Sequence, residues 1–270
     1  MEEIRKVISK VVEDSPEPSE PKPKPPAEQG EAPVRDMGNC IANCEICGGL
    51  GYIRKGGGGD IHDPNFGKLT ECPNRVTKLI LSEAVTGIPE AEAQNMLEGK
   101  YTPTIGQVKP LKAIDDLIKR GYGWLYMYGF YGTGKTTLLK LGTIEALKAG
   151  RRACYARLAD ILENLRAAFD SKRPSEEAAT RINYWSSVDF LFIDEFDKVR
   201  STEYADEKRF LLMDNRYLSA IGKQTATIMA SNVPPDKYEG YIRDRIEDGR
   251  FTVMDMGQDS VRPAMDWVNK

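Results

Sequence analysis

The sequence predicts an α/β fold in which five parallel strands alternate with helices, and two short motifs are the strongest signals for it. The first, Gly129-Phe130-Tyr131-Gly132-Thr133-Gly134-Lys135-Thr136, fits the phosphate-binding pattern G-x-x-x-x-G-K-S/T. It follows an apolar run at 124–128 and opens a helical pattern, which is the strand–loop–helix setting that this chemistry requires. The second motif is an apolar stretch at 190–195 that ends in two acids.

The glycine-rich motif is predicted to hold the phosphates of ATP. Its glycines let backbone N–H groups curl around the phosphates, and the following helix adds the positive end of its dipole. Lys135 would then lie on the β- and γ-phosphates, and Thr136 would hold Mg²⁺. The predicted nucleotide-binding residues are Gly129, Phe130, Tyr131, Gly132, Thr133, Gly134, Lys135, Thr136 and Thr137.

The two acids after the second apolar stretch predict hydrolysis. A carboxylate at the carboxyl end of a buried parallel strand is well placed to hold Mg²⁺, and Asp194 has this position. Glu195, one residue further, can polarise an attacking water. The alternative is a strand that merely ends in acids, which the presence of Lys135 disfavours.

The remaining elements of this domain, residues 123–270, follow in alternation. Further strands are expected at 152–157, 188–193, 225–230 and 251–256, and helices after the glycine-rich loop and at 158–169, 206–221 and 238–248. Such alternation is typical of a parallel sheet with helices on both faces.

Four segments precede that domain. Residues 1–13 form a short amphipathic helix, with Ile4, Val7, Ile8, Val11 and Val12 on one face, and residues 14–36 a proline-rich linker. The helix would dock either on its own protein or on a partner. Residues 37–78 are rich in cysteine and glycine, and residues 79–122 form a helical connector. Helices are expected at 76–86, 90–98 and 107–120, with a break at Gly87-Ile88-Pro89 and with Pro110 in the first turn of the last helix.

The cysteine-rich segment predicts a zinc site. Cys44 and Cys47 form a C-x-x-C knuckle, and Cys72 follows after a span that suits a hairpin with Gly56–Gly59 at its tip. A second knuckle is incomplete, because Asn74 and Arg75 stand where another cysteine is usual. The fourth ligand is therefore either His62 or Cys40. The alternative is a loop of free cysteines. Cys154 falls on a core strand and is expected to be merely buried.

Composition sets limits on compartment and partners. The 270 residues carry 38 Lys and Arg against 41 Asp and Glu, so a surface for nucleic acid must be a local patch. Arg166, Lys172 and Arg173 are a candidate patch for single-stranded DNA, and a solvated charged face is the plainer interpretation. No apolar run approaches the ~18 residues of a membrane span, and a signal peptide is not evident. We therefore expect a soluble cytoplasmic protein, in which five cysteines favour thiols or metal over disulfides.

From Cys44 to Arg262 the chain resembles the DnaC/DnaI/IstB-type helicase-loader ATPases of the AAA+ superfamily. The resemblance rests on the cysteine module, Gly87-Ile88-Pro89, the two motifs above, Met229-Ala230-Ser231-Asn232, and Tyr241-Ile242-Arg243-Asp244-Arg245-Ile246 before Gly249-Arg250-Phe251. It implies that Asn232 is the polar sensor beside the attacking water and that Arg245 is the finger that reaches a neighbour's ATP. Arg243 and Arg250 are alternatives for the finger, and Arg262 could touch nucleotide in its own chain. Like the loaders, the chain leaves no room for a helical lid after the fifth strand.

The resemblance also implies a function. It predicts an ATPase that binds a hexameric replicative helicase, assembles with copies of itself through the ATPase domain, and places the helicase on single-stranded DNA. The alternatives are an IstB-like transposition ATPase that acts on DNA with a transposase, and an ATP-gated adaptor with negligible turnover.

Overall fold

The structure is a computed structural model that describes residues 40, 44–48, 50–54, 62, 68–101, 103–238 and 240–258. The predicted helix at 1–13, the linker at 14–36 and Arg262 lie outside the described residues, so those predictions stay as they were made.

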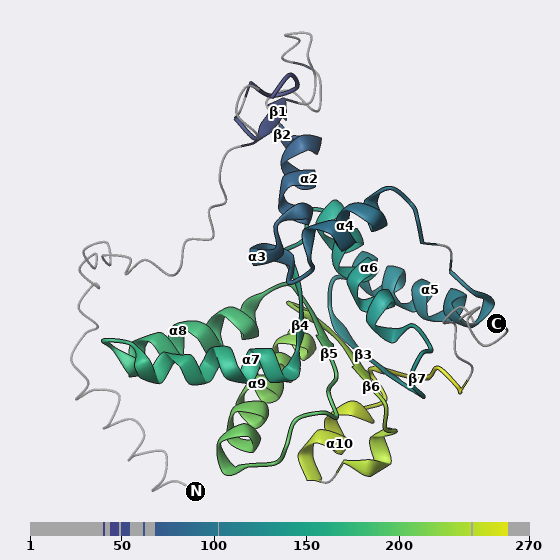
Figure 1. The fold of residues 1–270 in the computed structure, drawn as a ribbon, viewed down its shortest axis with the longest axis vertical. Coiled ribbons are helices and arrows are strands. Elements are labelled where there is room, and N and C mark those ends of the chain that lie inside the picture. Colours follow the sequence, from purple (N-terminus) through teal and green to yellow (C-terminus); the bar gives the residue numbers. More distant parts are fainter. Residues whose placement is uncertain are drawn as a thin grey trace, which may run out of the picture. The chain divides into compact units, whose positions relative to one another are not determined.

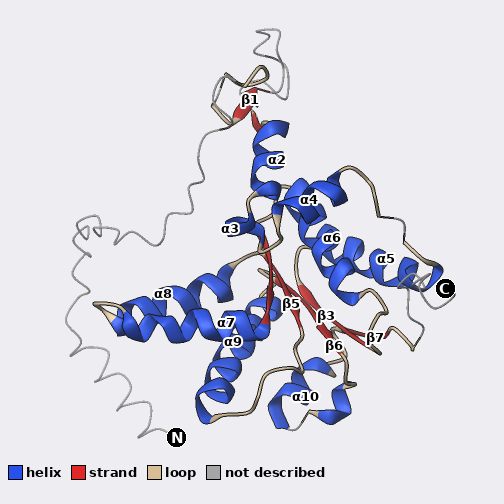
Figure 2. Cartoon of the chain, in the orientation of Figure 1, coloured by secondary structure: helices blue, strands red, loops and turns tan. Residues whose placement is uncertain are grey.

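A five-stranded parallel sheet forms the centre of the fold (Figure 2). Its strands are β3 (Gly123–Tyr128), β4 (Ala153–Arg157), β5 (Phe190–Asp194), β6 (Ala226–Ser231) and β7 (Thr252–Asp255), in the spatial order β4-β5-β6-β3-β7. Every neighbouring pair is parallel, which confirms the predicted α/β class. Because the strands run parallel, their carboxyl ends lie at the same edge of the sheet. The glycine-rich loop follows β3 and Glu195 follows β5, with β6 between these two strands.

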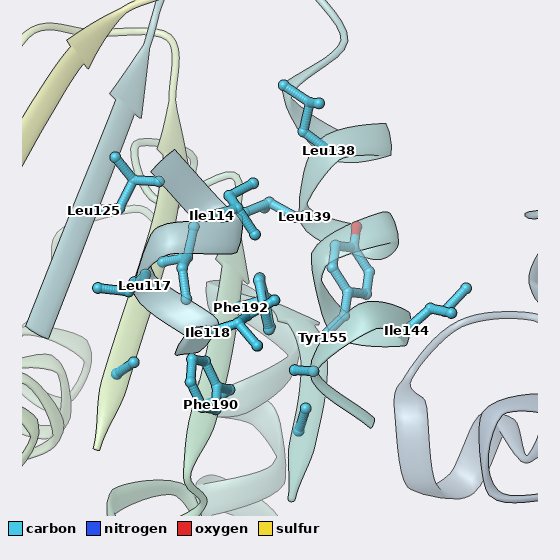
Figure 3. Close-up of a cluster of buried hydrophobic side chains, with 14 of the residues drawn as sticks. Ile114, Leu117, Ile118, Leu125, Leu138, Leu139, Ile144, Tyr155, Phe190 and Phe192 are labelled. Carbon is cyan, nitrogen blue, oxygen red and sulfur yellow. The ribbon is translucent and has the colours of Figure 1, made fainter. Parts of the chain in front are cut away.

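Helices cover both faces of the sheet (Figure 1). On one face lie α5 (Ile105–Arg120), which packs against β3, and α6 (Lys135–Lys148), which packs against β5. Figure 3 shows part of this core, with Ile114, Leu139 and Phe192 at its centre. Gly142 of α6 allows this close approach, since a Cβ there would lie 2.6 Å from the Phe192 ring.

The other face carries α7 (Leu158–Arg166), α9 (Glu203–Ile221) and α10 (Gly240–Ile246). The apolar residues of α7 recur at helical spacing, so one stripe is buried: Leu158, Ile161, Leu162 and Leu165. They pack with Trp124, Tyr126 and Phe196 into a second core on this side of the sheet. Short 3-10 turns follow α7 at Ala167–Asp170 and precede α10 at Pro235–Lys237.

The segment before the sheet contains α2 (Pro73–Leu81), α3 (Glu83–Thr86) and α4 (Glu90–Leu97). The single helix predicted at 76–86 is wrong, because the chain is extended at Ser82 and the helix breaks there. At Gly87 the backbone has a φ of +72°, and a Cβ would lie 1.9 Å from the carbonyl oxygen of Tyr155 in β4. Ile88 beside it is fully buried, so the Gly-Ile-Pro turn is packed directly against the sheet edge.

Two further expectations are corrected. The helix α5 begins at Ile105 rather than 107, because the backbone N–H of Thr104 donates to the side chain of Gln107 in a capping box, which places Pro110 in the second turn. The sequence analysis also missed α8 (Pro174–Ser187), which has no fully buried residue and therefore no clear apolar stripe. Pro174 in its first turn and the acids Glu176 and Glu177 are typical of the start of a helix and would have indicated it.

No helix follows β7 within the described residues, which end at 258, and none of the described helices is long and apolar enough to cross a membrane.

Candidate functional site

The glycine-rich loop joins β3 to α6 in the geometry that the sequence predicts. Gly129, Gly132 and Gly134 have φ values of +150°, +85° and +85°, and a Cβ on Gly129 would lie 2.8 Å from the carbonyl oxygen of Gly257. L side chains rarely adopt these angles, so glycine is required to curl the loop over the first turn of α6. The loop therefore has the shape that places backbone N–H groups around a phosphate.

Lys135 opens α6 and points into this loop. Its Nζ donates hydrogen bonds to the carbonyl oxygens of Gly129 (2.7 Å) and Phe130 (2.8 Å), and the side chain is nearly buried. Burial lowers the pKa of Lys135, an effect that the carboxylates of Asp194 and Asp197 oppose. The ammonium group thus stands at the centre of the loop.

The carboxylate of Asp194, at the end of β5, accepts three hydrogen bonds. Thr136 Oγ1 donates to its Oδ2 (2.7 Å), the Tyr155 hydroxyl donates to the same oxygen (3.0 Å), and the backbone N–H of Glu195 donates to Oδ1 (2.8 Å). Thr136 and Asp194, the predicted magnesium ligands, therefore lie side by side, and both offer the hard oxygen atoms that Mg²⁺ prefers. Sequence reasoning missed Tyr155, whose pKa is raised by burial and by the carboxylate of Asp194. No local pattern marks it, because its role depends on the pairing of β4 with β5.

Glu195 follows with a left-handed backbone, at a φ of +51°. Non-glycine residues adopt this conformation rarely, and such strain is concentrated at functional positions. The turn carries the chain away from the sheet while Glu195 stays exposed on the wall of the cavity described below.

Asn232 lies beyond β6 and is held by an acid that the sequence analysis overlooked. Its backbone N–H donates to Asp197 Oδ1 (2.9 Å), its side-chain Nδ2 donates to Oδ2 (3.2 Å), and the Ser231 hydroxyl also donates to Oδ1 (3.2 Å). Burial works against ionisation of Asp197, but the hydrogen bonds from Asn232 outweigh it and lower its pKa. The acidic run Asp194-Glu195-Phe196-Asp197 was the available signal.

These groups line one cavity of about 380 Å³, within the size range of small-molecule sites. Its lining from the predicted residues consists of Tyr131, Gly132, Gly134, Lys135, Thr136, Thr137, Asp194, Glu195 and Asn232. Gly129, Phe130 and Thr133 complete the loop outside this lining, with the Thr133 hydroxyl donating to the carbonyl of Phe130 (3.0 Å). Tyr101 and Gln107, which the sequence analysis did not single out, line the same cavity.

The three candidate finger arginines are held by acids of their own chain. Arg245 Nη2 donates to Asp214 Oδ1 (2.8 Å), and its guanidinium lies 4.4 Å from the centre of the Tyr217 ring. Arg243 pairs with Glu247, and Arg250 pairs with Asp248. The described lining of the nucleotide cavity contains no arginine, so all three lie outside the cavity of their own chain. Their role across an interface stays a prediction.

Two arginines of the candidate DNA patch also form ion pairs with nearby acids. Arg166 lies 3.8 Å from Glu163 and over the ring of Tyr204, and Arg173 lies 3.2 Å from Glu176. Lys172 is exposed between them in the chain. Exposed pairs of this kind are weak, so the contact of this patch with DNA stays a prediction.

The cysteine-rich segment brings four thiols together. The Sγ atoms of Cys40, Cys44, Cys47 and Cys72 all lie within 4.8 Å of one another, with Cys72 at 3.8 Å from Cys40 and 3.7 Å from Cys44. Tetrahedral zinc with four Zn–S bonds of about 2.3 Å requires S···S separations of about 3.8 Å. The cluster could therefore bind zinc. Of the two alternatives for the fourth position, the structure brings in Cys40, while His62 is exposed and outside the cluster.

Neighbouring residues donate hydrogen bonds to two of these sulfur atoms. The N–H of Gly51 donates to Cys47 Sγ and Asn74 Nδ2 donates to Cys44 Sγ, each at 3.2 Å. Burial disfavours the Cys44 thiolate, but hydrogen bonds from the backbone amides of Cys47 and Ile46 and from Asn74 outweigh it and lower the pKa to about 6. Asn74 stands where a second knuckle would carry cysteine. It is not a fourth ligand but donates a hydrogen bond to the sulfur of Cys44.

The antiparallel pairing of the predicted hairpin is confirmed, while its expected tip at Gly56–Gly59 lies outside the described residues. Strands β1 (Tyr52–Arg54) and β2 (Leu69–Glu71) pair in antiparallel register, and α2 follows directly after Cys72. Arg75, the other residue of the incomplete knuckle, is buried, pairs with Glu71 (2.8 Å) and lies over the Tyr52 ring. It therefore fixes the hairpin on the first turn of α2.

The parallel sheet in this strand order, the glycine-rich loop before α6 and the acids after β5 define a protein with the AAA+ type of P-loop fold. Within that class, the fold is that of DnaI: the DnaI crystal structure aligns with a TM-score of 0.51 at 16% identity over 70% of this chain and 100% of that one. A protein from Streptococcus pyogenes serotype M3, described as a candidate primosome component, aligns with a TM-score of 0.50 at 16% identity over 70% of this chain and 97% of that one. The predicted loader-type AAA+ fold is thus confirmed.

One curated relative also matches in sequence. The chromosomal replication initiator protein DnaA of Aquifex aeolicus (strain VF5) is 30% identical over 186 residues, which is 66% of this chain. The match spans 44% of that relative, so less than half of its length has a counterpart here. No established protein-family profile matches the chain.

Proposed function

We propose that this protein is an ATP-dependent helicase loader, which binds a hexameric replicative helicase and places it on single-stranded DNA. The observation that carries the proposal is the meeting of Lys135, Thr136, Asp194 and Glu195 in one cavity of a fold shared with DnaI. The sequence likeness to a replication initiator supports a role in the start of replication.

The residues divide the work of ATP hydrolysis between binding and water activation. The loop amides and Lys135 bind the phosphates, and Thr136 and Asp194 would hold Mg²⁺, which neutralises phosphate charge when bound. Glu195 takes a proton from the attacking water. Asn232, oriented by Asp197, fixes that water or the terminal phosphate.

ATP hydrolysis is coupled to assembly through Arg245. Arg245 on α10 leaves Asp214 and reaches the ATP of a neighbouring copy, where its charge stabilises the transition state. Hydrolysis then requires a homo-oligomer. The cysteine-rich segment and the residues before it bind the helicase. The ring or spiral of ATPase domains binds single-stranded DNA.

The ATPase part of the proposal is tested by two variants. Lys135→Ala should weaken ATP binding at least about tenfold, because the phosphates lose a buried cation. Glu195→Gln should keep ATP affinity but lower turnover at least about a hundredfold, because only water activation is lost. Equilibrium binding and single-turnover hydrolysis, with and without single-stranded DNA, measure the two effects. Wild-type turnover in Glu195→Gln would show that the base is misassigned, and ATP binding without turnover in the wild type would favour a nucleotide-gated adaptor.

A further inference from the structure

The hydroxyl of Tyr155 donates to the same carboxylate oxygen of Asp194 that accepts from Thr136. The distances to Asp194 Oδ2 are 3.0 Å from the Tyr155 hydroxyl and 2.7 Å from Thr136 Oγ1. Tyr155 comes from β4, the outermost strand on its side of the sheet, and it belongs neither to the glycine-rich loop nor to the acids after β5. It nevertheless contacts one of the two residues that would hold Mg²⁺.

The pairing of β4 with β5 brings Tyr155 to this position. Tyr155 lies opposite Phe192, and Asp194 follows two residues later in β5. Because successive side chains of a strand alternate between its faces, Phe192 and Asp194 share one face of the sheet. Tyr155 packs on that face together with Phe192. Its long side chain then reaches diagonally across to the carboxylate of Asp194.

The side chain and the backbone of Tyr155 are both held in place. Its ring is 9% exposed and lies among the apolar side chains on this face of the sheet (Figure 3). The ammonium group of Lys140 lies 5.2 Å from the ring centre, and it pairs at 2.6 Å with Glu92 of α4. The carbonyl of Tyr155 lies directly against Gly87. A hydroxyl on a side chain restrained in this way is preorganised for its acceptor.

The hydrogen bonds occupy most of the acceptor sites of Asp194. A carboxylate has about four lone-pair sites, which are shared between its two oxygens. Tyr155 and Thr136 occupy the sites of Oδ2, and the backbone N–H of Glu195 takes a site of Oδ1. Among the described residues, only Oδ1 therefore keeps a free site. Because the Thr136 hydroxyl gives its proton to Asp194, it can offer only lone pairs to a cation.

We propose that Tyr155 is a positioning residue for the Mg²⁺ site and acts through Asp194. Its hydroxyl fixes the rotation of the carboxylate, which in turn fixes the proton of Thr136 and leaves oxygen lone pairs for the metal. Hydrogen-bond partners behind metal ligands set their orientation in this way. The inference rests on the proposed binding of ATP and Mg²⁺, and it assigns Tyr155 to the metal rather than to the phosphates.

Tyr155→Phe tests this assignment, because it removes the hydroxyl and keeps the ring in the core. The measurement is equilibrium binding of ATP to the full chain, once with saturating Mg²⁺ and once in EDTA. The factor by which Mg²⁺ tightens ATP binding is the coupling between metal and nucleotide. We expect the variant to reduce this factor about tenfold and to change ATP binding in EDTA by less than about twofold.

Tyr126→Phe is the matched control. It also removes a buried hydroxyl from the sheet, but Tyr126 lies on the other face and donates to the carbonyl oxygen of Val233 (2.7 Å). We expect this control to keep the wild-type effect of Mg²⁺ on ATP binding. Melting temperatures report whether either variant disturbs the fold.

Several results would overturn the assignment. Equal losses with Mg²⁺ and in EDTA would show that Tyr155 only supports the fold, and an unchanged or larger effect of Mg²⁺ would show that its hydroxyl does not assist the metal. The same selective loss in Tyr126→Phe would show that the effect is not specific to Asp194.

The wild type separates failure of this inference from failure of the proposed function. If it binds ATP equally well with Mg²⁺ and in EDTA, the positioning role falls while the ATP site stands. If it binds no ATP, or binds ATP in a manner that Lys135→Ala does not change, the proposed ATP site itself fails, and the role of Tyr155 with it.

Discussion

At the scale of single residues, the carboxylate of Asp197 accepts hydrogen bonds from the backbone and the side chain of Asn232. The family resemblance marks Asn232 as the sensor, but the amide can act only in the orientation that Asp197 sets. We expect Asp197→Asn to lower kcat for ATP hydrolysis about tenfold and to leave KM within about twofold, because orientation is lost while phosphate binding is kept. Steady-state kinetics checks this, with the exposed Asp236→Asn as a control. A rise in KM at constant kcat would instead place Asp197 in ground-state binding.

The zinc ligands show what spacing can and cannot predict. The C-x-x-C knuckle and Cys72 identified three ligands, since that spacing places two thiolates on one turn. The fourth depended on how the chain before the knuckle folds back, which spacing does not encode, and only the structure separates Cys40 from His62.

We therefore expect one zinc per chain, lost in Cys40→Ser and retained in His62→Ala. Elemental analysis of protein purified without chelator measures both. Cys154→Ser is the matched control, because Cys154 is buried in β4 within the sheet core rather than in the cluster. Full zinc occupancy in Cys40→Ser together with its loss in His62→Ala would reverse the assignment.

At the scale of elements, strands were predicted well and one helix was missed. Strands such as β5 are buried along their whole length, so continuous apolar runs marked them. The helix α8 lies on the surface with only partly buried residues, and its pattern had no apolar stripe to detect. Tyr101 and Gln107, which line the cavity, and Tyr155, which donates to Asp194, were also missed, because only tertiary folding brings them to the site.

The Gly-Ile-Pro turn gives a prediction at this scale. Gly87→Ala combines a left-handed backbone with a Cβ that would lie 1.9 Å from the Tyr155 carbonyl oxygen, whereas Gly99→Ala has a similar φ of +70° and open space. The control should cost about 1 kcal/mol of unfolding free energy from its backbone alone. Gly87→Ala should cost about 1–3 kcal/mol more, because the turn must move away from β4. Denaturant unfolding of both proteins measures the difference, and equal stabilities would show that the turn does not pack against the sheet as described.

At the scale of the whole molecule, the proposed hydrolysis requires contacts between copies of the chain. Arg245 lies outside the cavity of its own chain and is held by Asp214 and Tyr217. We expect Arg245→Ala to bind ATP normally and to lose assembly-stimulated hydrolysis, by up to about 10³–10⁵-fold.

Mixing provides the corresponding test. Lys135→Ala protein still carries the arginine, and Arg245→Ala protein still binds ATP, so a mixture should regain part of the hydrolysis that each lacks alone. If both variants fold and assemble but the mixture stays inactive, Arg245 does not act across an interface.

The most direct test of the central claim is the loading of a replicative helicase from the same cell onto a closed circle of single-stranded DNA, measured as helicase retained on the circle. A circle has no end to thread, so helicase must be placed on it. We expect retention with wild-type protein and ATP, and none above the helicase-only background with Lys135→Ala. Equal retention with wild-type protein, with Lys135→Ala and with helicase alone would contradict the account, and ATP-dependent action on duplex DNA with a transposase instead would assign the protein to transposition.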